Sequence, residues 1–353
     1  MPRKKTAAQT FSGALEHLQG KNNTLSASAI AALTGAGKKE LAAFAKTWVL
    51  IPVERRRRVA RMMVELAEQD FKLDYNLLFR YFLNDEDALV RVSGIEGLWE
   101  DEDAALVKPM IGFLRSDPDA RVRAAAADSL GRFMLLAEYG RLGESQAQLI
   151  SEALLATTRS ASEDLVVRCR AVEALAYWSN DIVREIIEAA YEDDAPEMRA
   201  SAVAAMGRTA DAFWRKITLD ELESPNARMR FEAARASGEL ENREATARLI
   251  ELLDDADREV QSAAVSALGQ IGGKRAKQAL IDAAASEDEA LSGLATEALQ
   301  EVEFASGSDL MLFDLEVDQD KGIELDEDDE LESDQDDELN EEEWDDDMIE
   351  DEE

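Results

Sequence analysis

Apolar, small and polar positions recur along the chain with a period of 31 residues from Val59 onward. One apolar position in each unit serves as an anchor, and consecutive anchors are 31, 32, 45, 31, 31, 31 and 31 residues apart. The anchors are Val59, Val90, Val122, Val167, Met198, Met229, Val260 and Leu291. A fixed period of this length indicates a protein built by stacking small units of one kind.

Each unit is predicted to begin with an amphipathic helix. The fourth residue after the anchor is small in most units and the eighth is mostly large and apolar, so the apolar side chains share one helix face. Glycine at the ninth position, as in Gly131, Gly207, Gly238 and Gly269, predicts that the helix ends there. From the second unit on, the fifth residue before the anchor is Asp or Ser, which predicts the helix start.

A second amphipathic stretch follows in each unit. Examples are residues 104–114, 182–191, 245–253 and 275–284. A single helix pair cannot bury its own apolar faces, but neighbouring pairs stacked together form a continuous core. The sequence therefore predicts an all-α protein, an α-solenoid of about eight stacked helix pairs over residues 53–303.

The repeated segments at residues 119–131 and 257–269 resemble the HEAT repeat, specifically the short HEAT-like repeat of phycobilisome lyases. The resemblance covers about residues 53–303. It implies a helical solenoid, but it does not identify the function, because one fold carries many functions.

The segments outside the regular repeats carry separate expectations. Residues 1–25 are polar and are predicted to be disordered, whereas residues 26–52 are predicted to form capping helices that shield the first repeat. One interval holds 14 extra residues, around residues 135–148, which either lengthen the helices or add a loop.

Residues 304–353 are predicted to be a disordered acidic tail. From Asp309 to the end there are 26 acidic residues and one lysine, which contribute −25 of the total charge of −38. An apolar patch at residues 310–315 is expected to cap the last repeat, and Trp344, Met348 and Ile349 are expected to form a partner-binding motif. The tail can attract a basic protein, mimic nucleic acid, fold onto basic parts of the chain or serve only solubility.

Two sets of residues inside the array are candidates for specific roles. Aromatic residues near the middle of the array are candidate partner contacts, expected on the concave side if they project from second helices. They are Tyr177, Trp178, Tyr191, Phe213 and Trp214, and core packing is the competing interpretation. Arginines that follow the anchor are expected to form a structural ladder with acidic residues at neighbouring helix starts. This ladder set comprises Arg91, Arg123, Arg168, Arg199, Arg230, Asp87, Asp119, Asp164 and Asp257.

The inventory of reactive residues argues against an enzyme. The chain has one histidine, His17, and one cysteine, Cys169, so the paired His-Glu motifs of deoxyhypusine hydroxylase, an enzyme with similar repeats, are missing. Cys169 is expected to be partly exposed and inert. We predict no catalytic, cofactor-binding or metal-binding residues.

The predicted function is a non-enzymatic scaffold or adaptor for a protein partner, with a basic partner favoured by the acidic tail. Direct binding to nucleic acid or to a membrane is not expected, since the chain is acidic and has no apolar run of spanning length. A lone cysteine suits a reducing compartment and predicts a cytoplasmic protein. The alternatives are a bilin-lyase-like enzyme or enzyme subunit, and a chaperone-like shield for basic proteins.

Replacing Leu268 with aspartate tests the assignment of the apolar helix face. Leu268 is the eighth residue after its anchor, so Leu268→Asp would bury an unpaired charge at a cost of several kcal/mol. We expect at least the local units to unfold and the melting temperature, followed by circular dichroism, to fall by at least about 5 °C. An unchanged melting transition would refute the assignment.

Overall fold

The computed structural model describes the backbone of residues 10–20 and 24–313, and side chains up to residue 302. Every regular element in these residues is a helix. The chain divides into two units, Met1–Ser306 and Gly307–Glu353. The predictions for residues 314–353, including Trp344, Met348 and Ile349, lie outside the described residues. No helix among the described residues is long and apolar enough to cross a membrane.

The N-terminal part contains one helix more than the sequence pattern predicts. Residues 11–19, expected to be disordered, form α1 (Phe11–Gln19), with Ala14 and Leu18 buried. The guanidinium of Arg55 donates to the backbone carbonyls of His17 and Leu18, which ties α1 to the first repeat. A single short helix has no repeat partner in the sequence, so periodicity did not reveal it.

The expected capping helices follow as α2 (Ala27–Ala31) and α3 (Lys38–Trp48). Phe44 and Trp48 of α3 are fully buried and their rings stack 5.0 Å apart. The indole N–H of Trp48 donates to the carboxylate of Asp85 at 2.7 Å, so its one polar group is satisfied. These side chains cover the apolar end of the first repeat, as a terminal unit must.

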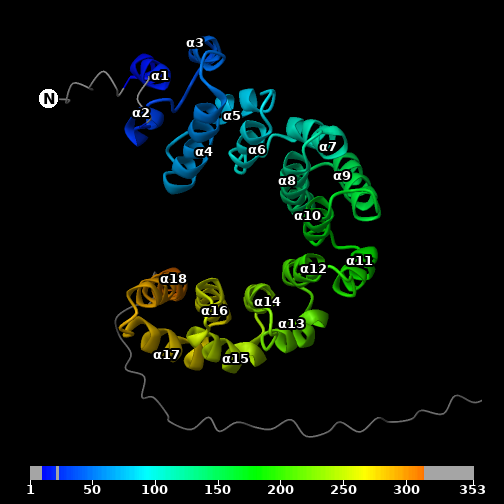
Figure 1. Ribbon diagram of the computed structural model, residues 1–353. Coiled ribbons are helices and arrows are strands. Elements are labelled where there is room, and N and C mark those ends of the chain that lie inside the picture. The colour runs from blue at the N-terminus through cyan, green and yellow to red at the C-terminus, as the bar shows by residue number, and fades with distance from the viewer. Residues whose placement is uncertain (1–9, 21–23, 314–353) are drawn as a thin grey trace, which may run out of the picture. The chain divides into compact units, whose positions relative to one another are not determined.

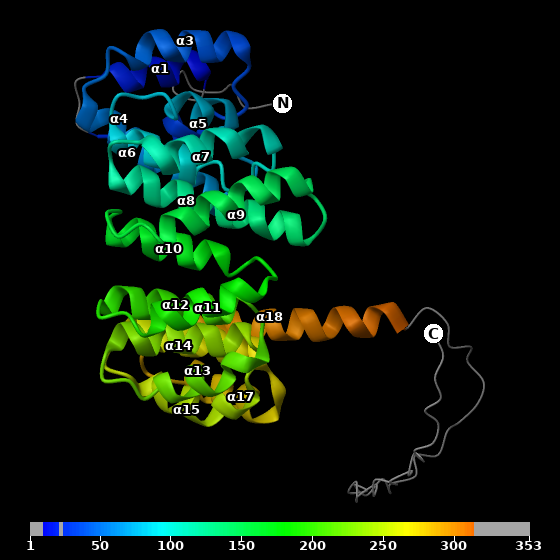
Figure 2. The same ribbon diagram turned by 90° about the vertical axis from the view of Figure 1, so that its right-hand side faces the viewer.

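The repeats form two rows of helices, as Figures 1 and 2 show. The first helices of the units are α4 (Val53–Gln69), α6 (Ala88–Glu96), α8 (Ala120–Glu138), α10 (Leu165–Leu175), α12 (Pro196–Arg208), α14 (Ala227–Glu239), α16 (Arg258–Ile271) and α18 (Glu289–Phe313). The second helices are α5 (Asn76–Phe82), α7 (Val107–Ser116), α9 (Glu144–Thr158), α11 (Asp181–Tyr191), α13 (Arg215–Glu221), α15 (Thr246–Glu251) and α17 (Gly273–Ala284). Short 3-10 turns flank three of the second helices: η2 (Ala104–Leu106), η3 (Ala212–Trp214), η4 (Arg243–Ala245) and η5 (Leu252–Asp254).

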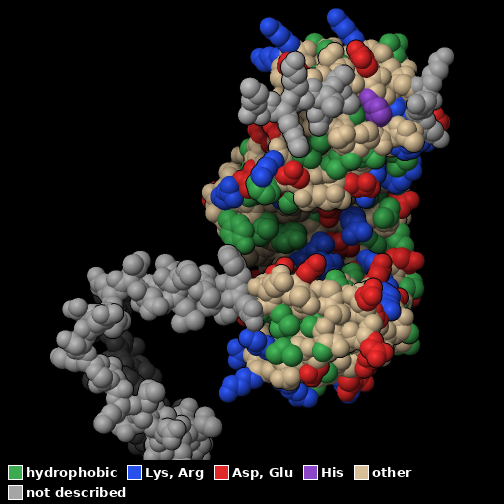
Figure 3. Space-filling model, turned by 90° about the vertical axis from the view of Figure 1, so that its left-hand side faces the viewer, with side chains coloured by type: hydrophobic (Ala, Val, Ile, Leu, Met, Phe, Trp, Pro, Cys, Tyr) green, Lys and Arg blue, Asp and Glu red, His purple; other side chains and the backbone are tan. Residues whose placement is uncertain are grey.

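The predicted α-solenoid is confirmed. The described residues form seven helix pairs, and α18 follows as an eighth first helix that contains the last anchor, Leu291. All eight anchors are buried between the two rows. Within the Met1–Ser306 unit the rows follow a curve with the first helices on its inner side, and Figure 3 shows the surface on that side. α18 itself continues to Phe313, beyond residue 303, where we expected the array to end.

The first helices begin two residues later than predicted. From α6 on, the N-caps lie three residues before the anchor, and the side chains of Asp87, Asp119, Asp164, Asn226 and Asp257 each accept a hydrogen bond from a backbone N–H of the first helical turn. The carboxylates five residues before the anchor lie in the turn before the helix and do not cap it. They accept a hydrogen bond from the backbone N–H of the cap residue or its equivalent, which preforms the turn that leads into the helix.

Gly131 lies inside α8 and does not end that helix, contrary to the prediction, whereas α12, α14 and α16 end within two residues of Gly207, Gly238 and Gly269. Most of these glycines also permit close contact between successive first helices. A Cβ added to each of three of them would lie 2.7–2.9 Å from an alanine Cα of the next first helix, which is too close for any real contact. The pairs are Gly131 with Ala174, Gly207 with Ala236, and Gly238 with Ala267. At Gly269 the corresponding contact, to the Cβ of Ala298, is an ordinary 3.7 Å.

The extra residues in the long interval lengthen the helices. α8 has 19 residues and α9 has 15, whereas α10 and α11 of the next unit have 11 each. The loop between α8 and α9 is short, at residues 139–143. The insertion therefore extends one helix pair rather than adding a long loop.

Adding one methyl group at Gly207 should loosen the array. Gly207→Ala places a Cβ against the backbone of Ala236, and we expect it to lower the free energy of unfolding by about 1–3 kcal/mol. Gly112 in α7 is the matched control because a Cβ there meets nothing within 4 Å. Gly112→Ala should raise the free energy of unfolding by about 0.5–1 kcal/mol, since alanine favours the helix. Chemical denaturation measures both, and equal effects would contradict the close-contact interpretation.

Candidate protein-binding groove

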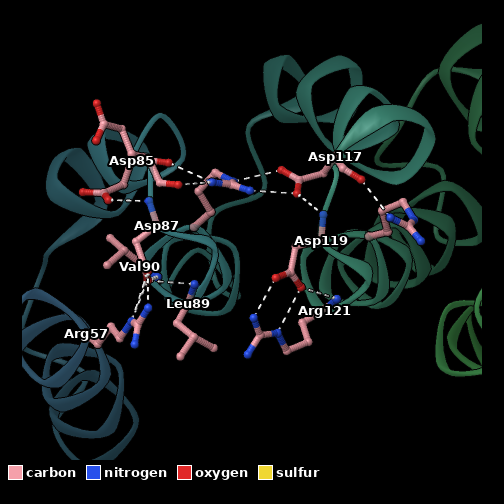
Figure 4. A network of polar contacts seen from close by, with 11 residues as sticks. Arg57, Asp85, Asp87, Leu89, Val90, Asp117, Asp119 and Arg121 are labelled. Carbon is pink, nitrogen blue, oxygen red and sulfur yellow. Dashed lines mark hydrogen bonds and ion pairs between the residues drawn. The ribbon is translucent and has the colours of Figure 1, made fainter. Parts of the chain in front are cut away.

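Arginine side chains tie several of the repeats to the next, as between the turns of Asp85 and Asp117 (Figure 4), which are joined by Arg91. Its Nη1 donates to the backbone carbonyl of Asp85 at 2.9 Å, in the turn before its own helix. Its Nε and Nη2 donate to the two carboxylate oxygens of Asp117, in the equivalent turn of the next repeat, at 2.9 and 2.8 Å. One planar guanidinium thus fixes the spacing of two successive turns.

Other repeats use the same bridge. Arg230 donates through Nη1 to the carbonyl of Ser224 and through Nε and Nη2 to the carboxylate of Asp255, at 2.7 and 2.8 Å. Arg123 bonds the carbonyl of Asp117 and the carboxylate of Glu163. We call this series the arginine ladder.

The ladder is weaker at two positions. Arg168 lies 3.7 Å from the carboxylate of Asp193, which is an ion pair without a close hydrogen bond. Arg199 donates to the carbonyls of Asp193 and Asp194 in its own turn, but the next repeat offers Ser224 where an acid would stand. Arg199 therefore has no carboxylate to bind in the equivalent turn of the next repeat.

The acids of the ladder differ from those expected. The arginines pair with acids that lie four or five residues before the next anchor, whereas Asp87, Asp119, Asp164 and Asp257 cap their helices. Arginines from other positions hold two of the caps: Arg57 lies 2.6 Å from Asp87, and Arg121 lies 2.6 Å from Asp119. The hydrogen bond from Arg121 is the main cause that lowers the pKa of Asp119 to about 2.

Two of the aromatic candidates, Phe213 and Trp214, do not line the inner side of the curve. Trp214 is 1% exposed and packs in the core, while its neighbour Phe213 is 50% exposed and lies 4.4 Å below the guanidinium of Arg184. Both belong to η3 in the second-helix row, which is the outer row, not the concave side. Trp178 is partly buried and packs against both of the apolar clusters that form the core of the array.

The two tyrosines are also held by neighbours. The hydroxyl of Tyr191 donates to the carboxylate of Glu221 at 2.5 Å, and burial together with this bond raises the pKa of Tyr191 to about 12. Tyr177 is partly buried, with the guanidinium of Arg208 5.6 Å from its ring centre. These contacts give all five aromatic candidates a packing role, and their contact with a partner remains a hypothesis.

A groove runs across the first helices α4, α6, α8 and α10. It consists of two adjoining hollows of about 790 and 660 Å³ that share Arg61, Leu89, Val92 and Glu96. We call it the inner groove. Its apolar lining is Leu25, Met62, Leu89, Val92, Ile95, Trp99, Ala124, Ala125 and Val166. In Figure 3, apolar and basic side chains lie close together in the hollow of this surface.

Arginines outnumber acidic residues around the inner groove, although the protein as a whole is acidic. The groove is lined by Arg57, Arg58, Arg61, Arg121, Arg132 and Arg170, and by Glu65, Glu68, Glu96 and Asp128. Arg61 bridges Glu65 and Glu96 at 3.1 and 3.3 Å. Burial raises the pKa of Glu96, and the nearby Arg61 opposes that shift. The groove therefore combines an apolar floor with a surplus of arginine.

Sequence reasoning did not identify this groove. Most of its residues stand one position before an anchor or two, three, six, nine or ten positions after it, on a side of the first helices that the anchors do not occupy. The clearest signal was Trp99, a large aromatic residue where other units have glycine, and it is 50% exposed. Val166, 43% exposed, is a second apolar residue on this face.

A smaller hollow of about 510 Å³ lies farther along, over α10, α12 and α14. At its base Glu173 is buried between Arg170 at 2.6 Å and Arg208 at 3.3 Å, and it accepts a hydrogen bond from the hydroxyl of Ser201. Cys169 lines this hollow but is only 5% exposed, not partly exposed as expected, and burial raises the pKa of its thiol. No group of three or more metal-ligating side chains occurs among the residues that the structure describes.

Comparison with known proteins gives one family match. The model of HEAT repeats matches residues 76–158 and 216–300. No protein of curated function has a significantly similar sequence.

Several solved structures are similar to the chain. The CpcE–CpcF complex of phycocyanin lyase from Nostoc sp. PCC7120 is 19% identical, with a TM-score of 0.46 over 64% of this chain and 87% of that chain. Human deoxyhypusine hydroxylase is 18% identical, with a TM-score of 0.34 over 75% and 96%. The Kap121p–Pho4p complex is 14% identical, with a TM-score of 0.43 over 86% of this chain and 40% of that chain.

Breaking one bridge of the ladder should destabilise the fold in a pH-dependent way. The hydrogen bond from Arg230 is the main cause that lowers the pKa of Asp255. Arg230→Met leaves this buried carboxylate without its partner, and we expect a loss of about 1–3 kcal/mol in the free energy of unfolding at pH 7.

The pH dependence of this loss follows from the lowered pKa. A carboxyl with a lowered pKa stabilises the fold fully above its unfolded pKa of about 4, and this stabilisation disappears as the pH falls through the folded pKa. The difference between wild type and Arg230→Met should therefore shrink below about pH 4. Denaturant titrations at several pH values measure it, with the exposed Arg115→Met as control. A difference independent of pH would contradict the ion-pair explanation.

Proposed function

Because the chain is a HEAT-repeat protein, we propose that it is a non-enzymatic scaffold that binds protein partners on its first-helix face. Stacked repeats of this kind offer extended surfaces that suit protein partners. The observation that carries the proposal is the inner groove, which is continuous over four first helices. We further propose a cytoplasmic location, because a single cysteine suits a reducing compartment.

The composition of the inner groove supports a protein ligand. Exposed aromatic and arginine side chains supply most of the binding energy at protein interfaces, and Trp99 lies in the groove among six arginines. The arginine ladder holds the helices that carry these side chains. The free-energy cost of ordering the binding surface is therefore small. A preformed apolar floor with a charged rim is the usual composition of such an interface.

We propose a second, electrostatic role for the acidic C-terminal segment. Its charge of −25 over residues 309–353 attracts a basic protein at long range and raises the rate of encounter. The attraction between exposed charges weakens when salt is added. Trp344, Met348 and Ile349 are the proposed apolar anchors in that segment.

Copurification with full-length and truncated protein tests both roles. We expect a chain that ends at Phe313 to lose basic partners and to keep partners of the groove, and we expect Trp99→Ala to do the reverse. Raising the salt concentration should release the basic partners first. Mass spectrometry identifies the bound proteins, and circular dichroism checks that each variant is folded.

Two outcomes would contradict the scaffold. Loss of every partner on truncation would favour a chaperone-like shield in which the acidic segment alone acts. Transfer of a bilin chromophore to an acceptor protein by the purified chain would show a lyase instead.

A further inference from the structure

Arg132 in α8 has hydrogen-bond donors that its neighbours leave unused. Its Nη1 donates to the backbone carbonyl of Leu98 at 2.7 Å. Its Nε and Nη2 are buried atoms without a hydrogen-bond partner among the described residues, and so is the hydroxyl oxygen of Ser129, three residues earlier. Both residues line the inner groove. A buried donor without an acceptor is costly, so this edge of the guanidinium favours an incoming acceptor.

The rest of the molecule shows which acceptor fits this edge. Arg91 and Arg230 have the same anchor, Nη1 on a backbone carbonyl, and in both of them Nε and Nη2 hold the two oxygens of a carboxylate. Two parallel N–H donors match the spacing of carboxylate oxygens. Arg132 therefore makes the carbonyl contact that Arg91 and Arg230 make, but its Nε and Nη2 hold no carboxylate.

Comparison of equivalent repeat positions explains why the carboxylate is missing. Arg208 stands ten residues after its anchor, as Arg132 does, and it pairs at 3.3 Å with Glu173, six residues after the preceding anchor. The residue equivalent to Glu173 in the repeat before Arg132 is Glu96, which instead pairs with Arg61. Arg132 thus lacks the partner that its counterpart has.

The surroundings of Arg132 decide the chemical class of the ligand. Leu89, Val92 and Trp99 provide an apolar floor beside it, which suits a side chain next to the carboxylate. Glu68, Glu96 and Asp128 in the same hollow offset most of its arginine charge, so the dense charge of a polyphosphate or nucleic acid is disfavoured more strongly than a single carboxylate. Asp101, Glu102 and Asp128 act on Arg132 through space, but none of them accepts a hydrogen bond from its Nε or Nη2.

We infer that the inner groove binds an acidic segment of a partner protein, with an Asp or Glu carboxylate on Nε and Nη2 of Arg132 and an adjacent apolar side chain on the floor. The hydroxyl of Ser129 donates to the same carboxylate. This inference rests on the proposed function and specifies its ligand. It differs from the role proposed for the C-terminal segment, which attracts a basic protein.

Fluorescence anisotropy with a defined peptide tests the inference. The probe is a labelled peptide in which leucine alternates with glutamate, and the control peptide has glutamine in place of glutamate. We expect the full-length protein to bind the glutamate peptide at least about tenfold more tightly, because charge-assisted bidentate bonds are the strong ones.

Substitutions then locate the site. Arg132→Leu should weaken binding of the glutamate peptide at least about tenfold, and Arg132→Lys should restore little of it, since lysine cannot form the two parallel bonds. Arg215→Leu is the matched control, because Arg215 also donates to a backbone carbonyl, that of Leu240, but lies in α13 outside the groove. Should Arg132→Leu not fold, Ser129→Ala replaces it, with an expected weakening of a few fold.

Three results would overturn the inference. They are equal affinity for the two peptides, equal affinity of Arg132→Leu and Arg215→Leu, and failure of the wild-type protein to bind the glutamate peptide. None of these results tests the scaffold proposal. That proposal is tested by the partners that copurify with the wild-type protein and are lost in Trp99→Ala. If Trp99→Ala loses those partners but the glutamate peptide does not bind, the groove binds proteins through a segment that is not acidic.

Discussion

The structure depends on a guanidinium that is shared between successive turns. Arg91 and Arg230 each hold a backbone carbonyl of their own repeat and a carboxylate of the next, through bonds of 2.7–2.9 Å. Because the guanidinium is flat and rigid, these bonds set both the distance and the rotation between neighbouring repeats. At the other end of the first helices, glycine against alanine lets the backbones approach closely, as at Gly207 and Ala236. Polar bonds at one end and steric fit at the other therefore define a single stacking geometry.

The ladder adapts where the sequence varies. After the lengthened pair α8 and α9, the residue five before the next anchor is Ser162, and Glu163 beside it accepts Arg123 instead. In the unit of Val260 a glutamine replaces the arginine, and its amide still donates to the carbonyl of Asp255. The carbonyl half of the bridge thus persists with a neutral side chain, whereas the carboxylate half requires an arginine. The carbonyl contact therefore belongs to the fold of each repeat, and the carboxylate contact belongs to the stacking.

The helical architecture could be predicted from the sequence, but the binding surfaces could not. Periodicity placed the eight anchors correctly in the core, because burial of one helix face is what the period records. It did not place the helix starts, since an acidic residue before a helix serves equally well as a cap or as an acceptor for an arginine. Nor did it distinguish a glycine that ends a helix from one that permits contact, as at Gly131, because both depend on the absence of a Cβ. The groove remained hidden for the same reason: whether Trp99 and Arg132 meet depends on the rotation between repeats.

That rotation also explains how a repetitive protein acquires one particular site. Every first helix offers the same positions to the inner face, so a uniform array would repeat the pairing of Arg208 with Glu173 along its whole length. In the N-terminal part, Arg61 of α4 takes the equivalent acid, Glu96, and Arg132 keeps an unused edge. A substitution in one repeat thus creates binding capacity in a neighbouring repeat without altering the core. A site of this origin leaves no motif in the sequence, because its essential feature is an interaction that the neighbouring repeat no longer supplies.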